Sequence, residues 1–330
     1  MTALVKQRSY AGAAAGWCLC LCLCAALASA QEFPSRPLRL VVGFPPGGGA
    51  DGAARAVAQK LTESLGQAVV VDNRSGAGGN VAAEIVAHAV ADGHTLLVTS
   101  PGPVVINPAL YSSLPYDPQK ELAPVTLIAA GANVLTVHPA VQANNVQQLM
   151  ALARSKPDTL NYASSGIGTI PHLSGELFRI AARLPVVHVA YKGAGAAVID
   201  VMAGRADYIL VSVPSVLTQI RAKRLRALAV TTLKRAAALP DLPTIDESGL
   251  PGYESIAWWG VMAPAAVPMS VVSTLNRTIV KSLNATETRE RLATEGVEVA
   301  GTTPAQFGDF LKRETAKWAQ VIKTAGIRID

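Results

Sequence analysis

The sequence predicts an α/β fold of two similar lobes, each a mainly parallel sheet flanked by helices. Short β-branched runs alternate with amphipathic helical segments, and Gly and Pro residues separate them. A chain of 330 residues exceeds what one hydrophobic core usually covers, so two domains are expected. The alternation continues beyond a crossover near Gly131, which predicts one lobe from residues 31–131 and 254–330 and another from residues 132–253.

The first lobe begins with a strand over residues 38–44 and a helix after Gly49. Apolar residues recur at helical spacing up to Leu65, and Gly66 is placed to close the helix. A second Gly-rich loop, Ser75–Gly79, leads into the next expected helix. Further strands are expected at 69–71, 95–99 and 125–129, and the second helix at 81–90.

The second lobe repeats this pattern, and the chain then ends in helices. Expected strands cover 134–137, 160–163, 186–190, 207–211 and 225–230, and expected helices cover 146–154, 172–183 and 196–203. A Pro- and Gly-rich connection over 239–252 precedes a strand over 256–262. The last helix has Thr303 as N-cap, Pro304 in the first turn and Gln306 in capping-box position. Its apolar stripe favours core packing for Trp318 over a role as a ligand platform.

Residues 1–30 are interpreted as an export signal. Lys6 and Arg8 precede an apolar run, and Ala28-Ser29-Ala30 fits cleavage after Ala30, which places the mature protein in the periplasm. An uncleaved membrane anchor is the alternative, since the run approaches the roughly 20 residues that span a bilayer. All four cysteines lie inside this segment, so cleavage leaves none for a disulfide, a metal or a nucleophile.

The charge balance argues against nucleic-acid binding. Removal of Lys6 and Arg8 leaves 27 of the 29 basic residues against 23 acidic ones. The one dense basic run, Arg221–Arg226, is interpreted as a solvated helix end before a strand. A mild positive field favours an anionic small molecule. No cofactor is expected, because the chain has neither a phosphate loop nor a dinucleotide fingerprint.

The sharpest local feature is the loop Gly43–Asp51, between an expected strand and helix. Glycines let backbone N–H groups approach a ligand, and a helix N-terminus favours an anion. We therefore expect a carboxylate cradle. The alternative is a tight strand-to-helix turn capped by Asp51. The candidate ligand-binding residues in this loop are Phe44, Pro45, Gly47, Gly48 and Asp51.

A second loop, Ser164–His172, has the same place in the other half of the chain. It offers hydroxyl groups, backbone donors and another helix N-terminus. Two such loops, one per lobe, would face each other across a cleft. The candidate residues are Ser164, Ser165, Gly166, Gly168, Thr169 and His172, with helix capping as the alternative role for Ser165 and Thr169.

A secreted hydrolase that uses Ser164 or Ser165 with His172 is the enzymatic alternative. The Gly-x-Ser-x-Gly elbow is absent, because the serines are followed rather than bracketed by glycines. The five histidines do not have a metal-site spacing, and His172 with Glu176 is expected to form a side-chain pair on one helix face. We expect binding without turnover, and neither a catalytic residue nor a metal site.

The chain resembles the Bug or TctC-like extracytoplasmic solute receptors, the binding components of tripartite tricarboxylate transporters. The resemblance spans essentially the whole mature chain. It is carried by segments in matching order and spacing: Phe33–Arg39, Phe44–Asp51, Asn73–Asn80, Asp92–Leu96, Asn107–Tyr111, Leu160–Gly166, His172–Glu176 and Tyr191–Gly193.

The resemblance implies a two-lobed periplasmic-binding-protein fold that closes on an organic acid. The family's carboxylate-holding loops match Phe44–Asp51 and Ser164–His172, and a third cleft segment matches Tyr191–Gly193. The expected ligand-binding set is completed by Ser100, Tyr191, Gly193 and Asp207, with a role as a strand or turn residue as the alternative for Asp207. Leu210-Val211-Ser212 stands where many members carry an acidic or polar residue, which argues against an amino acid as ligand. The implied partners are a small carboxylate and membrane transporter subunits, unless the receptor is an orphan, and a monomer is expected.

Overall fold

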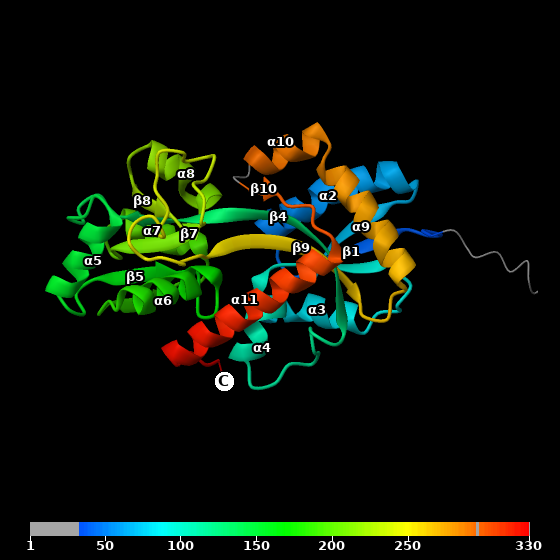
Figure 1. Ribbon diagram of the computed structural model, residues 1–330, viewed down its shortest axis with the longest axis horizontal. Helices are drawn as coiled ribbons and strands as arrows, with labels where there is room; N and C mark the ends of the chain where they lie inside the picture. Colours follow the sequence, from blue (N-terminus) through cyan, green and yellow to red (C-terminus); the bar gives the residue numbers. More distant parts are fainter. Residues whose placement is uncertain (1–32, 295–296, 330) are drawn as a thin grey trace, which may run out of the picture.

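The computed structural model describes residues 33–294 and 297–329, so the expected export segment lies outside the described residues. Two groups of strands and helices are joined by two long strands, β4 (Leu122–Val137) and β9 (Ile256–Pro264) (Figure 1). The strand order is β2-β1-β3-β9-β4-β7-β5-β6, and β8 and β10 also pair with β4. The α/β class is therefore confirmed.

Lobe 1, as we call the first group, contains the first and the last of the described strands and helices. Its strands are β1 (Leu38–Val42), β2 (Val69–Asn73), β3 (Thr95–Thr99) and β10 (Glu298–Val299). Its helices are α2 (Gly49–Leu65), α3 (Asn80–Ala87), α4 (Asn107–Leu110), α9 (Met269–Leu283), α10 (Thr286–Thr294) and α11 (Pro304–Ala325), with short helical turns at Ala77–Gly79 and Gly102–Ile106. Apolar residues on both faces of this sheet form two core clusters.

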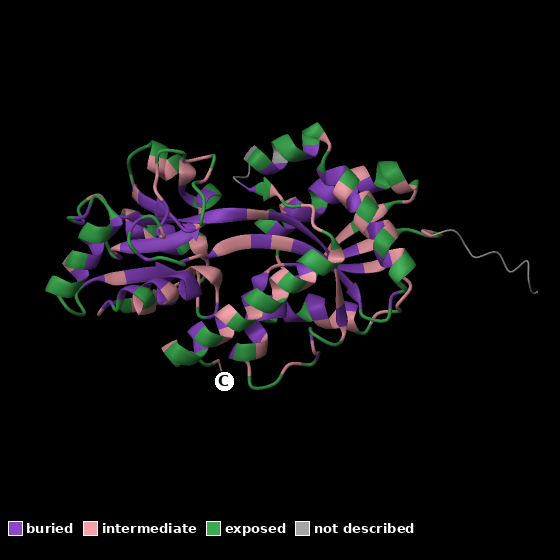
Figure 2. Ribbon diagram, in the orientation of Figure 1, coloured by how far each residue is buried: buried purple, intermediate pink, exposed green. Residues whose placement is uncertain are grey.

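Lobe 2, the second group, has its own core. Its strands are β5 (Asn161–Ser164), β6 (Val187–Ala190), β7 (Tyr208–Ser212) and β8 (Arg226–Val230). Its helices are α5 (Val146–Ser155), α6 (Ile170–Ala182), α7 (Ala194–Met202) and α8 (Val213–Arg221). Two buried clusters again cover the two faces of the sheet. Figure 2 shows buried residues along β4 and β9 and exposed residues on the outer faces of the helices.

The long strand β4 replaces the two separate strands expected at 125–129 and 134–137. Gly131 does not interrupt it, because Ala130, Gly131 and Ala132 pair with Trp258, Ala257 and Ile256 of β9. The ladder hydrogen bonds thus continue through the crossover. The sheets are mixed rather than mainly parallel: β1 to β3 and β5 to β7 pair in parallel, whereas β4 and β9 run antiparallel to their neighbours.

Most other local expectations are confirmed. Gly66 closes α2 in the left-handed conformation, with φ of 65°. Thr303 and Gln306 form the predicted capping box of α11, and Trp318 is buried in the core. The basic run after α8 is mostly exposed, as expected. None of the described helices is both long enough and apolar enough to cross a membrane.

Candidate functional site

The segments that follow β1 and β3 in lobe 1 and β5 in lobe 2 line a common cavity of about 260 Å³, beside β9. The residues that give it its chemical character are Phe44, Ser100, Asn107, Tyr111, Thr169 and Trp259. Its lining includes hydroxyl, amide, aromatic and aliphatic groups but no charged side chain. Any charge on a ligand must therefore be balanced by backbone dipoles or by groups outside the lining.

The first Gly-rich loop is shaped by Asp51, at the third position of α2. Its carboxylate accepts hydrogen bonds from the Gly47 N–H at 2.9 Å, from Arg55 at 2.9 Å and from Asn73 at 3.0 Å. Asn73 also donates to the carbonyl of Phe44 at 3.0 Å, which ties the start of the loop to β2. Gly47 has φ of 85°, which favours glycine.

These bonds keep Asp51 ionised. Burial raises the pKa of the Asp51 carboxyl, but the hydrogen bonds from Arg55, Gly47 and Asn73 outweigh burial and lower the pKa to about 2. The side chain is buried beneath the loop, whereas residues 45–49 are exposed. Asp51 therefore has the turn-supporting role that was the alternative expectation.

The second loop is held by a similar bond from the third position of α6. The Gly168 N–H donates to Nδ1 of His172 at 3.0 Å, and the Thr169 hydroxyl donates to the Gly166 carbonyl at 2.7 Å. The Gly166 N–H donates to the Ser164 hydroxyl at 3.2 Å, and that hydroxyl lies 2.7 Å from Nε2 of His188. Ser164 and His172 are both buried, at 0% and 4% exposure.

His172 is held in its neutral form by its surroundings. Burial lowers its pKa to about 4, His188 and Arg179 contribute in the same direction, and Glu176 opposes them. The expected pairing of His172 with Glu176 is wrong, because the Glu176 carboxylate accepts hydrogen bonds from Tyr162 and Arg179 instead. Ionised Glu176 is thus satisfied without His172.

The third predicted segment packs against the second loop. The Tyr191 N–H donates to the Ser164 carbonyl at 3.0 Å, and the Gly193 N–H donates to the Ser165 carbonyl at 3.1 Å. Ser100 lies across the cleft, in the cavity lining. The structure thus brings these residues to one region.

Asp207 requires a correction, because it does not join this region. It precedes the start of β7, whereas Ser212, at the carboxyl end of the strand, pairs with Asn133 near the crossover. Five residues of strand span roughly 16 Å. The Asp207 carboxylate accepts the Asn161 N–H at 2.8 Å, so its role is to fix the start of β5.

The helices that follow the two main loops begin without a side-chain cap. The N-cap residues are Gly48 for α2 and Thr169 for α6, and neither side chain accepts a hydrogen bond from the first turn. The described helices α3, α7, α8 and α9 also begin without a side-chain cap, whereas Asn145 caps α5 and Thr303 with Gln306 closes the first turn of α11. The first N–H groups of α2 and α6 therefore remain available for an anion.

Sequence reasoning missed the aromatic and amide groups of the cavity, namely Trp259, Tyr111 and Asn107. The signal for Trp259 was present, because neighbouring residues of a strand point to opposite faces. Trp258 is fully buried against Phe307, so Trp259 faces the other way, where a Cβ on Gly49 would overlap its ring. Asn107 begins α4 and Tyr111 follows its end, and neither this short helix nor the helical turn Gly102–Ile106 before it was expected.

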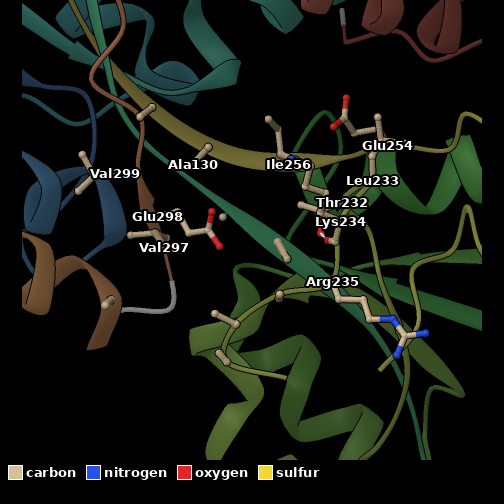
Figure 3. Close-up of a pocket in the computed structure, with 17 residues that line it drawn as sticks. Ala130, Thr232, Leu233, Lys234, Arg235, Glu254, Ile256, Val297, Glu298 and Val299 are labelled. Atoms are coloured by element: carbon tan, nitrogen blue, oxygen red, sulfur yellow. Dashed lines mark hydrogen bonds between the residues drawn. The ribbon is translucent and has the colours of Figure 1, made fainter. Parts of the chain in front are cut away.

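A larger hollow of about 460 Å³ lies beside β4 and β9 (Figure 3). Its walls come from the loop after β8 and from the segment around β10, and Glu298 and Arg235 project from opposite sides. None of the ligand-binding residues expected from the sequence lines this hollow. The smaller cavity is the better candidate, because Phe44 of the first loop and Gly168 and Thr169 of the second line it. The start of α2 meets it only through Trp259, whose ring lies against Gly49.

The hydrolase alternative requires Ser164 or Ser165 beside His172. Ser165 is half-buried, and none of the described hydrogen bonds joins its hydroxyl to a histidine. Ser164 contacts His188 rather than His172, and it is fully buried behind the second loop. A nucleophile must reach the substrate carbonyl, which this burial prevents. Among the described residues no cluster of His, Cys, Asp or Glu could hold a metal ion.

Comparison with known proteins places the chain among transport receptors. The model of the tripartite tricarboxylate transporter family receptor matches residues 53–327. The UPF0065 protein in the tcbD–tcbE intergenic region of Pseudomonas sp. strain P51 is 44% identical, over 88% of this chain and 86% of that protein. BugT of Bordetella pertussis is 35% identical, over 92% of this chain and 94% of BugT.

Solved structures show the same similarity. The R. palustris Rpa4515 structure with adipate has 38% identity and a TM-score of 0.80, and the match covers 90% of this chain and all of that chain. MatC from Rhodopseudomonas palustris with bound malate has 30% identity and a TM-score of 0.76, over 88% of this chain and all of that chain. The periplasmic binding protein BugD has 32% identity and a TM-score of 0.76, over 90% of this chain and all of BugD.

Proposed function

This chain belongs to the tripartite tricarboxylate transporter receptor family, and we propose that it captures a small organic acid between its lobes for membrane transporter subunits. One observation carries the proposal. The uncapped start of α6 lines a cavity that has no charged side chain, and the uncapped start of α2 lies against Trp259 at its wall. Backbone N–H groups and helix dipoles favour an anion at that place.

The ligand class follows from the size and lining of the cavity. About 260 Å³ suits a compact molecule, and Phe44, Trp259 and aliphatic groups surround an apolar body better than a hydroxylated one. The relatives that carry adipate and malate support a dicarboxylate. Of these two acids, adipate has the longer apolar body. We propose an acid of this kind as the ligand, held partly through backbone amides.

A thermal-shift screen tests this assignment. We expect adipate to raise the melting temperature more than malate, citrate, benzoate or a neutral diamide. An acid at about a hundred times its dissociation constant stabilises the folded state by roughly 2.7 kcal/mol, which corresponds to a shift of about 4 °C for a chain of this length. A response only to neutral compounds would contradict an anion site.

Binding without turnover is part of the same proposal. The buried Ser164 and the missing nucleophile elbow support it. Incubation of adipate, or of its methyl ester as a hydrolase substrate, with stoichiometric protein should return both unchanged. Conversion that disappears in Ser164→Ala would establish the hydrolase alternative.

We also propose that the two lobes move about β4 and β9 as one clamp, with the boundaries near residues 131 and 254. Separate cores in each lobe support this division. Saturation with the best acid of the screen should reduce the radius of gyration measured by small-angle X-ray scattering. An unchanged radius would mean that ligand does not shift the lobe arrangement.

The protein is proposed to act as a periplasmic monomer, released by cleavage after Ala30. The basic start, the apolar run and the small residues of Ala28-Ser29-Ala30 support this site. N-terminal sequencing of protein purified from the periplasm should begin at Gln31. A chain that starts at Met1 and stays with the membrane would show that the segment is an anchor.

A further inference from the structure

The two ligand loops share a bond that the sequence does not reveal. In each, the residue just before the N-cap is a glycine, and its N–H donates to the side chain four residues later, at the third position of the helix. The pairs are Gly47 with Asp51 at 2.9 Å and Gly168 with His172 at 3.0 Å. A usual capping box instead joins the third position to the N-cap itself, as in α11.

We propose that Asp51 and His172 are positioning residues that hold the two loops in their binding conformation through one backbone N–H each, and that protonation of His172 releases the second loop while Asp51 keeps the first in place. The inference rests on the proposed carboxylate-binding function. It replaces the expected direct contact of these two side chains with the ligand.

Stacking fixes the orientation of the His172 ring. Its ring stacks on His188, with centroids 4.0 Å apart and planes inclined by 16°. His188 in turn stacks on Tyr162 at 4.8 Å. This column fixes the ring plane, so Nδ1 stays directed at Gly168. With Nδ1 accepting a hydrogen bond, the neutral ring carries its proton on Nε2.

Protonation would break this bond. A protonated imidazole has N–H donors at both nitrogens, so Nδ1 would face the Gly168 N–H donor to donor. The groups that face His172 are His188 on β6 and Glu176 and Arg179 on α6, with Tyr162 of β5 behind His188. Glu176 is occupied by Arg179 and Tyr162, so it does not stabilise the imidazolium ion by a direct hydrogen bond. Asp51 differs because it accepts from three donors and stays ionised at mildly acidic pH.

The Gly168 N–H gives a readout that does not depend on the ligand. We would label the glycines with ¹⁵N and measure protection from hydrogen exchange at Gly168 and Gly47 in the mature protein between pH 7.5 and 4. The wild-type protein should lose protection at Gly168 by at least tenfold as the pH approaches 4, and Gly47 should keep it. Equal protection of both amides across this range overturns the proposal without any mutation.

Two variants of His172 separate the effect of its hydrogen-bond acceptor, Nδ1, from the effect of its stacked ring. His172→Phe keeps an aromatic ring for the stack but removes the acceptor, so Gly168 should be unprotected at every pH. His172→Asn places Oδ1 where Nδ1 stood and does not titrate, so protection should be restored at pH 7.5 and persist at pH 4. His138→Asn is the matched control, because His138 Nδ1 also accepts a backbone N–H, from Ala140 at 3.2 Å, in a turn at the far end of β4. It should behave as wild type.

Measurements of adipate affinity test whether the conformation of the second loop affects ligand binding. Calorimetric titration at pH 7.5 should give at least tenfold weaker binding for His172→Phe and a substantial recovery for His172→Asn. As the pH falls, affinity should fall more steeply for wild type than for His172→Asn, and adipate's own titration cancels in this comparison. Parallel profiles would overturn the role of His172 in binding. If wild type does not bind adipate, the proposed ligand is wrong, and Gly168 protection still decides the loop support.

Discussion

Replacement of Gly48 with Val is expected to weaken binding of the best acid of the screen by more than tenfold and to leave the protein folded. Gly48 is the exposed N-cap residue of α2 and has φ of −85° and ψ of 169°. This is extended backbone that Val adopts without strain. A Cβ there would meet only the Pro45 carbonyl, at an ordinary 3.7 Å. The branched side chain should obstruct a ligand carboxylate at the first N–H groups of α2.

The neighbouring glycines make Gly48 the informative position. Gly47 has positive φ, and a Cβ on Gly49 would overlap Trp259, so substitutions at either site would disturb the loop itself. Gly48→Ala is the graded control and should give a smaller loss than Val. Calorimetry should show about 1.4 kcal/mol or more lost for Val, with an unchanged circular dichroism spectrum. A folded Gly48→Val protein that binds within threefold of wild type would show that the ligand does not approach this helix end.

The sequence predicted the order of the elements because each strand and helix has a local signal. Gly66 ends α2, and Thr303 with Gln306 begins α11, through interactions within a few residues. The two Gly-rich loops were identified for the same reason. The continuous strand β4 was not predicted, since Gly131 is a strand breaker by local propensity and only pairing with β9 keeps it extended.

The sequence predicted the two loops of the site but not the hydrogen bonds from Gly47 to Asp51 and from Gly168 to His172 that hold them. The sequence placed His172 and Asp51 near a ligand, and both do lie at the loops. Their direction depends on distant partners: Asn73 is 22 residues from Asp51, and His188 is 16 residues from His172. No spacing rule connects such pairs. The notion of Asp207 as a cleft residue failed because strand direction, which decides the end that faces the cleft, is set by pairing with β4.

Acid should destabilise the protein in two separate steps, of which His172 provides the first. Its folded pKa of about 4 lies below the usual 6.5, so the unfolded chain binds a proton that the folded protein resists. The stability contribution is therefore complete above pH 6.5 and is lost as the pH falls to about 4. The difference amounts to about 3 kcal/mol. His172→Asn should reduce the loss of unfolding free energy between pH 6.5 and 4, although burial also lowers the pKa of His188, which keeps a part of that loss. Urea unfolding at pH 7, 5.5 and 4 measures the difference between the variant and wild type.

Asp51 provides the second step, at lower pH. Its folded pKa of about 2 lies below the usual 3.8, so its contribution is present above pH 3.8 and is lost as the pH falls through 2. A shift of this size corresponds to about 2 kcal/mol. Asp51→Asn should make the unfolding free energy fall less steeply between pH 4 and 2.5 than in wild type, while carboxyls such as Asp72 and Asp92, whose pKa values are also lowered, keep a part of the slope. The Gly47 and Gly168 N–H groups have no other described hydrogen-bond acceptor than Asp51 and His172. If the unfolding free energy of both variants depends on pH as steeply as that of wild type, these two side chains do not hold the loops.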